Sequence, residues 1–321
     1  MRPLRIAVIG AGSIAQRYHL PSLQRLAEEG LPIERAAIGD VDAAKAAQAA
    51  ARFGFRESYA DYTALLDAVA PDAVWALVPF ERMREVAGFF LAQGVPTLME
   101  KPPGKNSQET QELLEIAQQR GTPHQVAFNR RHAPALQRMA ALLHEAGEMR
   151  AVGCQFYRVR RREPYFAYGT GLHGLDALRY LAMGEVCELH TERGPRGSAL
   201  VTLRYDDGSI GSMEMFPQVG YQSERYTGHA GERSVIVEGV IDWLTRYPGF
   251  LTCYQAGERI LHEDYAATSP APEVSGGFYG ESKHFITCLL AGERPQPDLA
   301  EALLSVRLAE AVLRGESLVL H

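Results

Sequence analysis

A lysine and a glutamate directly follow a short apolar segment in the first third of the chain. We predict a strand from Pro96 to Met99, and Glu100, Lys101 and Pro102 come immediately after it. Ligands of parallel sheets bind beyond the carboxyl ends of the strands, so a cation and a carboxylate there are well placed to contact one. A surface ion pair before a proline-stiffened turn explains the tripeptide equally well when it is taken alone.

A glycine-rich turn near the N-terminus is a second feature with chemical content. Leu4 to Ile9 is a continuous apolar run, which is typical of a strand buried on both faces. Gly10, Gly12 and Ala15 follow in the pattern G-x-G-x-x-A, which allows a tight turn and lets a pyrophosphate approach the backbone. Sterics alone also favour glycine in such turns. A helix predicted from Ile14 to Glu29 would direct its N-terminus at the phosphates.

A carboxylate closes the next apolar segment. This segment begins at Glu34 and ends in Asp40, at the spacing expected for the ribose-binding residue of a dinucleotide site. A carboxylate accepts hydrogen bonds from the ribose hydroxyls and repels a 2'-phosphate. We therefore expect NAD as the cofactor in preference to NADP, which stays possible because basic residues elsewhere can reach a 2'-phosphate.

Strands and helices alternate through the first 128 residues. This alternation implies right-handed crossovers and an α/β fold with a doubly wound parallel sheet. A capping box at Asn106 and Glu109 predicts the start of one of the helices. The further predicted elements are helices at 43–53, 62–70, 83–93 and 106–120 and strands at 73–78 and 125–128.

Taken together, these segments resemble the family of glucose-fructose oxidoreductase, inositol dehydrogenase and MocA, and the likeness covers most of the chain. The resemblance implies a dinucleotide-binding Rossmann domain at 1–124 and an α/β domain at 125–321, whose large, mostly antiparallel sheet serves substrate binding and oligomerisation. The matching segments are GAGSIA at 10–15, Asp40, PDAVWALVP at 71–79, EKP at 100–102, VAFNRR at 126–131, GTGLHGLDALRYLAMGE at 169–185, FYGESKHF at 278–285 and AEALLSVRLAEAV at 300–312.

The resemblance also implies an activity, which is hydride transfer between a nicotinamide and a sugar, a polyol or a related hydroxyl or carbonyl compound. Lys101 inherits a position near nicotinamide and substrate, where it would hydrogen-bond the reacting oxygen. His173 matches a histidine that family enzymes place opposite the lysine, and an imidazole can accept the hydroxyl proton. Asp176, one helical turn on, can orient it. A histidine that makes only local hydrogen bonds at a helix N-terminus is the ordinary alternative.

The expected site residues form three groups, and no metal site is expected. The catalytic residues are Lys101 and His173. The cofactor-binding residues are Gly10, Gly12, Ser13, Ile14, Asp40, Val78, Pro79, Glu100 and Lys101. The substrate-binding residues are Asn129, Arg131, Tyr168, Thr170 and Asp176.

Two departures from the family pattern leave a second function open. Many members carry an aspartate that holds a sugar hydroxyl where this chain has Gly169. Many also have asparagine and then histidine after the position of Pro79, where Phe80 begins a different segment. These changes favour a non-catalytic protein that senses a dinucleotide and a metabolite. The presence of both Lys101 and His173 favours the enzyme.

The second half of the chain has the alternation and the turn residues of an antiparallel sheet. Such a sheet with one open face commonly forms an oligomer interface, so we expect a homodimer or homotetramer through it. The predicted strands are Met149 to Arg162, Leu200 to Tyr205, Ile210 to Phe216, Val235 to Val240 and Leu251 to Tyr254.

Composition excludes several other classes of protein. The 321 residues carry a net charge of -6, the wrong sign for a nucleic-acid partner. No apolar run approaches the length of a membrane span, and the apolar N-terminus is better explained as a buried strand than as a signal peptide. The four cysteines are scattered without a C-x-x-C pair, which favours the reducing cytoplasm. The expected partner is a small-molecule substrate, as the implied activity requires.

Overall fold

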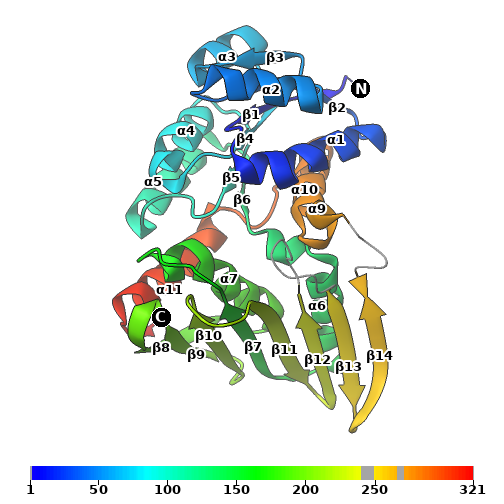
Figure 1. The fold of residues 1–321 in the computed structure, drawn as a ribbon, viewed down its shortest axis with the longest axis vertical. Helices are drawn as coiled ribbons and strands as arrows, with labels where there is room; N and C mark the ends of the chain where they lie inside the picture. Colours follow the sequence, from blue (N-terminus) through cyan, green and yellow to red (C-terminus); the bar gives the residue numbers. More distant parts are fainter. Residues whose placement is uncertain (1, 240–248, 266–270, 321) are drawn as a thin grey trace. The chain divides into compact units, whose positions relative to one another are not determined.

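The computed structural model describes residues 2–239, 249–265 and 271–320, and the chain divides into two compact units (Figure 1). The first unit contains residues 1–128 and 278–303, and the second contains residues 129–277 and 304–321. These extents differ from the expected ranges 1–124 and 125–321, because residues 125–128 complete the first sheet and a segment near the C-terminus returns to the first unit. Within the described ranges, no helix is long and apolar enough to cross a membrane.

The first unit is built on a six-stranded parallel sheet in the order β3-β2-β1-β4-β5-β6. Its strands are β1 (Leu4–Ile9), β2 (Ile33–Gly39), β3 (Glu57–Tyr59), β4 (Ala73–Ala76), β5 (Thr97–Glu100) and β6 (His124–Ala127). The strand order reverses between β1 and β4, so the loops after these two strands border one crevice. The predicted doubly wound sheet is confirmed. Strand β3 was not predicted, because its residues are polar and largely exposed.

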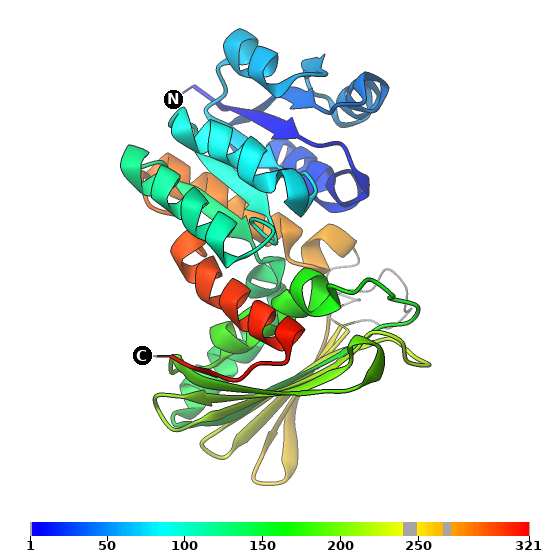
Figure 2. The ribbon, with the colours of Figure 1, turned by 90° about the vertical axis from the view of Figure 1, so that its left-hand side faces the viewer.

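Helices cover both faces of this sheet. Figure 2 shows α4 and α5 side by side over one face. Helices α1, α2 and α10 supply apolar side chains to a core cluster with the strands, so a segment near the C-terminus shares a core with the first helix. The helices of this unit are η1 (Ala15–His19), α1 (Leu20–Glu28), α2 (Ala43–Phe53), α3 (Tyr62–Val69), α4 (Phe80–Ala92), α5 (Ser107–Arg120) and α10 (Phe278–Ala291).

The helix starts explain where the predicted boundaries shift. The helix predicted from Ile14 to Glu29 begins with η1, a π-helical turn. Helix α4 begins three residues before the predicted start at Met83, because Pro79 takes the N-cap position with an extended ψ of 146°. The Asn106 side chain accepts the Glu109 N–H at 2.8 Å, as the capping box predicts.

The second unit is built on a nine-stranded sheet in the order β14-β13-β12-β11-β7-β10-β9-β8-β15. Only β7 and β10 among these neighbours are parallel, which confirms the mostly antiparallel prediction. The strands are β7 (Met149–Tyr157), β8 (Val186–Arg193), β9 (Ala199–Tyr205), β10 (Ile210–Phe216), β11 (Ser223–Ala230), β12 (Arg233–Glu238), β13 (Phe250–Gln255), β14 (Glu258–Asp264) and β15 (Leu318–Val319).

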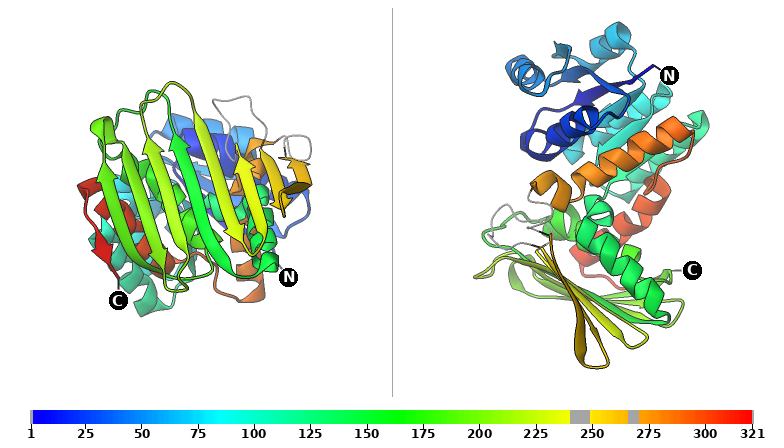
Figure 3. Two further views of the ribbon diagram at one scale, coloured as in Figure 1. Left: turned by 90° about the horizontal axis from the view of Figure 1, so that it is seen from below. Right: turned by 90° about the vertical axis from the view of Figure 1, so that its right-hand side faces the viewer.

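One face of the nine-stranded sheet packs against helices α6 (Pro134–Ala146) and α7 (Leu172–Leu181). The opposite face is seen in the left panel of Figure 3. Strand β7 ends at Tyr157 rather than at the predicted Arg162, and Arg160 leaves the extended conformation with φ of 62°. The strand predicted from Val235 to Val240 corresponds to β12, and position 240 lies outside the described residues.

A buried ion cluster joins three elements of the second unit. Glu224 on β11 accepts hydrogen bonds from Arg130, at 3.0 and 3.1 Å, and from Arg158. All three side chains are less than 10% exposed. Burial raises the pKa of the Glu224 carboxyl, but the two guanidinium charges outweigh burial and bring it to about 2. The cluster therefore stabilises the fold only while Glu224 is ionised.

Substituting Glu224 by Gln tests this cluster. We expect the free energy of unfolding near neutral pH to fall by about 3 kcal/mol, because two buried cations lose their shared carboxylate. The folded-state pKa is depressed from 4.5, so the stabilisation is full above 4.5 and disappears as pH falls toward about 2. Urea unfolding of both proteins at several pH values measures the difference.

Glu188→Gln is the control, because Glu188 pairs with Arg204 on an exposed part of the same sheet and should matter little. An equal loss of stability in both variants, or a loss in Glu224→Gln that does not diminish at low pH, would contradict the assignment.

Candidate active site

The glycine turn lies where β1, β2 and β4 end together. The Gly10 N–H donates to the Gly39 carbonyl at 2.7 Å, and the Leu77 N–H donates to the Ile9 carbonyl at 2.7 Å. Gly10 has φ of 106°, and a Cβ on it would stand 2.3 Å from the Leu77 carbonyl oxygen. Only glycine therefore fits this position.

At Gly12, unlike Gly10, the fold does not require a glycine. A Cβ on Gly12 would meet no atom within 4 Å, so the fold itself leaves room for a side chain there. Gly12, Ser13 and Ile14 are exposed and lead into the first helix, whose initial N–H groups have no carbonyl of their own helix to bind. This arrangement suits a phosphate group that must approach the backbone closely.

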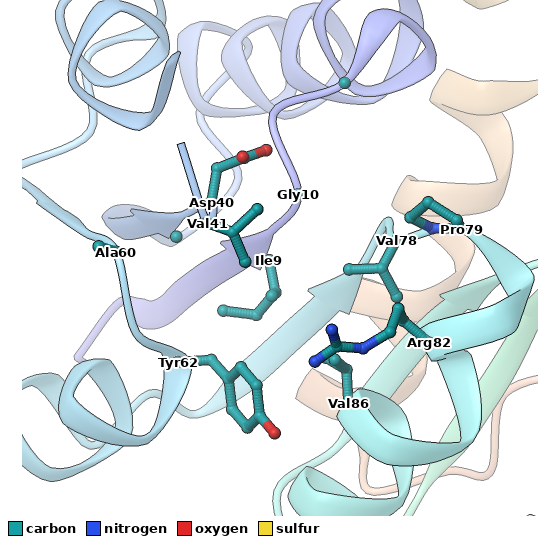
Figure 4. Close-up of a pocket in the computed structure, with 12 residues that line it drawn as sticks. Ile9, Gly10, Asp40, Val41, Ala60, Tyr62, Val78, Pro79, Arg82 and Val86 are labelled. Atoms are coloured by element: carbon teal, nitrogen blue, oxygen red, sulfur yellow. The ribbon is translucent and has the colours of Figure 1, made fainter. Parts of the chain in front are cut away.

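A cavity of about 340 Å³ opens beside the turn (Figure 4). This volume lies in the range of small-molecule sites. Its walls are mostly apolar, with Asp40 at one side and Arg82 and Tyr62 at another. The lining residues are Ile9, Gly10, Gly12, Gly39, Asp40, Val41, Ala60, Tyr62, Val78, Pro79, Arg82 and Val86.

Asp40 is held in place at the edge of this cavity. One of its carboxylate oxygens accepts the Ala11 N–H at 2.7 Å, and the other accepts the Asp42 N–H at 2.9 Å. Each oxygen keeps acceptor capacity for a ribose hydroxyl. Asp42 accepts hydrogen bonds from the N–H groups of Ala44 and Lys45 and so caps α2, whereas Asp40 faces the cavity.

Arg82 and Tyr62 form a part of the cavity wall that the sequence analysis missed. The Arg82 guanidinium donates to Glu85 at 2.6 Å, and the Tyr62 hydroxyl donates to the same oxygen at 3.0 Å. Glu85 thus binds both side chains, and Arg82 and Tyr62 line the same part of the cavity (Figure 4). The helical spacing of Arg82 and Glu85 was visible in the sequence, but their proximity to Tyr62 depends on the sheet order.

The Glu100-Lys101 pair lies at the carboxyl end of β5, as predicted. Glu100 has 15% of its side chain exposed, and one of its oxygens accepts the Lys101 N–H at 3.0 Å. The other oxygen lies 2.9 Å from Nε2 of His19. Burial raises the pKa of Glu100, but the hydrogen bond to His19 and the charges of His19 and Lys101 outweigh it, so that pKa is lowered.

In the second unit, close packing of a glycine-containing helix sets the place of His173. A π-helical turn, η3 (Ala167–Gly171), leads into α7. A Cβ on Gly171 would stand 2.5 Å from the Met215 sulfur, and one on Gly174 would stand 2.4 Å from the Met213 methyl carbon. The glycines thus let the helix lie close to β10. His173 stands between them in sequence and is 7% exposed.

Asp176 takes part in a polar cluster within the second unit. The Arg131 guanidinium donates to both oxygens of Asp176 at 2.8 Å, and the Ser305 hydroxyl donates to one of them at 3.0 Å. Arg179 in turn donates to Ser305 at 2.7 Å. Asp176 is fully buried, so its carboxylate anchors α7 through these partners.

The other residues expected at a substrate site are also in the second unit. The Asn129 amide donates to the Gly276 carbonyl at 2.6 Å and is buried. Tyr168 and Thr170 belong to η3, are buried, and the Thr170 hydroxyl accepts a hydrogen bond from Arg161 at 3.0 Å. Arg131 and Asp176 are the only two of the five that an ion pair within the described residues joins to each other.

At Gly169, an aromatic ring lies where a side chain would project. A Cβ on Gly169 would stand 3.1 Å from Cδ2 of the Tyr165 ring. The Gly169 N–H donates to the Tyr165 carbonyl at 2.7 Å. Among the described residues, no group of three or more histidine, cysteine or acidic side chains is arranged to hold a metal ion.

Comparison with known proteins agrees with this geometry. The family model described as "Oxidoreductase family, NAD-binding Rossmann fold" matches residues 4–128. The inositol 2-dehydrogenase of Leifsonia xyli subsp. xyli is 30% identical over 242 residues, which are 68% of each chain. Inositol 2-dehydrogenase 2 of Saccharopolyspora erythraea is 27% identical and covers 97% of this chain and 93% of its own. A Gfo/Idh/MocA family oxidoreductase from Vibrio cholerae has the same fold, with a TM-score of 0.82 at 24% identity over 97% of each chain.

The fold and its crevice define a Rossmann oxidoreductase that uses a nicotinamide dinucleotide. The chain belongs to the Gfo/Idh/MocA family, as the sequence resemblance predicted. It is an NAD(P)-dependent dehydrogenase acting on CH–OH groups, which decides against the non-catalytic sensing protein. The residues around Gly12 and Asp40 fit the cofactor. Gly12 leaves space for phosphates beside an exposed helix start, and Asp40 presents a hydrogen-bonded carboxylate to the ribose.

Two glycine-to-alanine variants separate the roles of the turn. We expect Gly10→Ala to destabilise the protein by more than about 2 kcal/mol, because its Cβ would overlap the Leu77 carbonyl at positive φ. Gly12→Ala should unfold at the wild-type temperature but bind NAD at least about tenfold more weakly, because its methyl group occupies the space of the phosphates. Thermal unfolding and calorimetric titration with NAD measure the two effects. Wild-type NAD affinity in Gly12→Ala would refute the placement of the phosphates.

Proposed function

We propose that the protein oxidises a hydroxyl group of a sugar, a polyol or a related compound with NAD, or catalyses the reverse reduction. The observation that carries the proposal is the fixed Glu100-Lys101 pair in the same parallel sheet as the dinucleotide crevice. Relatives named inositol 2-dehydrogenase support the substrate class. In this proposal the first unit binds the dinucleotide, and the second contributes substrate binding and oligomerisation.

The geometry of the first unit supports an assignment of the cofactor site. We assign Gly10, Gly12, Ser13 and Ile14 to the phosphates and Asp40 to the adenosine ribose. Val78, Pro79, Glu100 and Lys101 would complete the site, since they lie at or just beyond the ends of β4 and β5. The carboxylate of Asp40 disfavours a 2'-phosphate, so NAD is preferred over NADP.

Lys101 is distinguished from the other lysines by its surroundings. The chain has only four lysines among its 33 basic residues. Lys45 and Lys105 are exposed partners of Asp42 and Glu109, and Lys283 is exposed above the Tyr279 ring. Lys101 alone among the four is partly buried. An ammonium group, unlike a guanidinium, can exchange a proton under ordinary conditions.

These residues divide the reaction between them. The bound nicotinamide supplies an acceptor for the hydride of the substrate carbon. The Lys101 ammonium donates a hydrogen bond to the reacting oxygen and stabilises negative charge on it as the proton leaves. His173 accepts that proton, since an imidazole is a competent base near neutral pH. Asn129, Arg131, Tyr168, Thr170 and Asp176 would shape the substrate site, with Asp176 acting through Arg131.

Tyr165 makes the substrate site differ from that of relatives with an aspartate at position 169. The ring of Tyr165 borders the space into which that carboxylate would project. A carboxylate accepts hydrogen bonds from hydroxyl groups, whereas a tyrosine ring presents an apolar face. We therefore propose a substrate with fewer hydroxyl groups, or one with an apolar substituent, at the position the aspartate would contact.

The open face of the nine-stranded sheet supports self-association. Thr202, Ser212, Gly153 and Thr227 are register partners across four central strands, and they form a row of small residues with little relief. A homodimer or homotetramer through this face is therefore part of the proposal. All four cysteines are free, which supports a reducing compartment such as the cytoplasm.

Lys101→Met tests the catalytic assignment, because methionine keeps much of the length and removes the charge. Wild-type protein is mixed with NAD, or separately with NADP, and a panel of sugars, polyols and hydroxy acids. With a substrate present, the near-ultraviolet absorbance of the reduced nicotinamide should rise. This rise should need a lower concentration of NAD than of NADP. We expect Lys101→Met to lower kcat at least about a hundredfold while the Kd for NAD changes less than about threefold.

Lys105→Met is the matched control, because Lys105 is exposed, lies four residues away and pairs with Glu109. It should keep wild-type turnover. If Lys101→Met turned over as fast as Lys105→Met, the catalytic assignment of Lys101 would be wrong.

The mass of the protein in solution tests the sheet interface. We expect light scattering to give a dimer or a tetramer, and Ser212→Arg to shift the mass toward the monomer, because a long charged side chain would stand in the middle of the flat row. Gln24→Arg, at a partly exposed position of helix α1 in the first unit, should leave the mass unchanged. A wild-type protein that scatters as a monomer would falsify the interface.

A further inference from the structure

A buried histidine connects the helix after the glycine turn to the strand that carries Lys101. His19 is the last residue of the π-helical turn η1 and is completely buried. Its Nε2 lies 2.9 Å from Oε1 of Glu100, the last residue of β5. A single hydrogen bond thus links two segments that are 81 residues apart in the sequence, the turn that follows the glycine-rich loop and the strand end that precedes Lys101.

Glu100 transmits this contact to the backbone of Lys101. Its second oxygen, Oε2, accepts the Lys101 N–H at 3.0 Å. The carboxylate is therefore held from two directions, by the imidazole and by the peptide group of the lysine. A carboxylate with charged or strongly polar donors on both oxygens has little freedom to rotate. The Lys101 peptide group and the His19 imidazole are thus joined through one carboxylate.

Helix α10 closes the far side of the imidazole. Oε1 of Glu281, a fully buried residue of α10, lies 4.0 Å from Nδ1 of His19. The Phe278 ring meets the imidazole edge-on with 5.1 Å between centroids, and the same ring stacks on Tyr18 at 4.4 Å. The imidazole is enclosed by aromatic and acidic groups of the first unit, so solvent does not compete for its bond to Glu100.

The alternative is that His19 is an ordinary polar residue of the core that only adds stability. Burying a carboxylate next to an imidazole is expensive, and well-packed apolar residues commonly stabilise such a place as well or better. A role in stability alone therefore does not explain why the Glu100–His19 pair lies next to Lys101. The two explanations differ in whether Lys101 moves when the bond is lost.

We propose that His19 is a positioning residue for the reaction, which fixes the backbone at Lys101 through the carboxylate of Glu100. The proposal rests on the proposed catalytic role of Lys101. His19 does not contact the reacting atoms in this assignment. It fixes the position of the Lys101 backbone relative to the glycine-rich turn. The lysine side chain reaches the substrate oxygen from that position.

Two variants at position 19, whose side chains are of similar length, isolate the hydrogen bond between His19 and Glu100. Gln at position 19 retains an N–H donor for Glu100, whereas Met has no donor and fills a similar volume. We expect His19→Met to lower kcat at least about tenfold with KM within about threefold, because a displacement of the lysine affects the transition state most. His19→Gln should restore kcat to within about threefold of wild type.

A readout without catalysis follows Lys101 directly. Protein labelled with [13C]lysine contains four lysines and so gives four Cε signals. We expect the Lys101 signal, assigned by its absence in Lys101→Met, to shift in His19→Met and to return toward its wild-type position in His19→Gln. The signals of Lys45, Lys105 and Lys283 should stay in place. If His19→Met does not fold, His19→Leu replaces it, because leucine also lacks a donor for Glu100 and leaves the carboxylate charge in place, and the Lys101 signal should again shift.

Ser22→Ala is the matched control for the helix. Ser22 is buried one turn after His19, and its hydroxyl donates only within the helix, to the Tyr18 carbonyl at 2.7 Å. This variant should leave the Lys101 signal and kcat unchanged. An unshifted Lys101 signal in His19→Met, or equal shifts in His19→Met and Ser22→Ala, would overturn the positioning role. A normal kcat in Lys101→Met would instead overturn the catalytic role of Lys101, and a wild-type protein that reduced NAD with none of the compounds would overturn the proposed function, so these failures are distinguishable.

Discussion

The close approach of three strand ends around Gly10 is the constraint on which the first unit depends. Its N–H binds the carbonyl at the end of β2, and its missing Cβ lets the carbonyl after β4 come within contact distance. Because β1 and β4 are the strands at which the order reverses, this contact also defines the crevice. The cavity, the Asp40 carboxylate and the exposed start of the first helix all take their places from it.

Two irregular helix starts have a comparable effect in the two units. A π-helical turn ends at His19 in the first unit, and another precedes His173 in the second. One extra residue in a turn changes which side chain faces the neighbouring strand, and such turns are frequent at functional sites. In the second unit, Gly171 and Gly174 lack side chains, which lets this segment pack closely against β10. The position of His173 between them therefore depends on these two glycines.

Local patterns in the sequence were sufficient for the parallel sheet, the glycine turn, Asp40 and the Glu100-Lys101 pair. Each of these depends on residues adjacent in the chain or on one crossover. Contacts between distant segments were not predictable in the same way. The return of α10 to the first unit and the pairing of Arg131 with Asp176 require knowledge of which helices share a core. Strands β3 and β14 were missed because their exposed residues lack an apolar alternation.

The distribution of basic side chains separates structural from chemical roles. Arginine neutralises two of the buried acids, as Arg130 and Arg158 do for Glu224 and Arg131 does for Asp176. A guanidinium is suited to this because its planar donors bind both carboxylate oxygens and it keeps its charge at all relevant pH values. Lys101 is a different kind of cation, partly buried beside an ionised carboxylate at a strand end. An ammonium concentrates its charge on one nitrogen that can donate to a single oxygen, so the location of Lys101 supports the hydrogen bond to the reacting oxygen that is proposed for it.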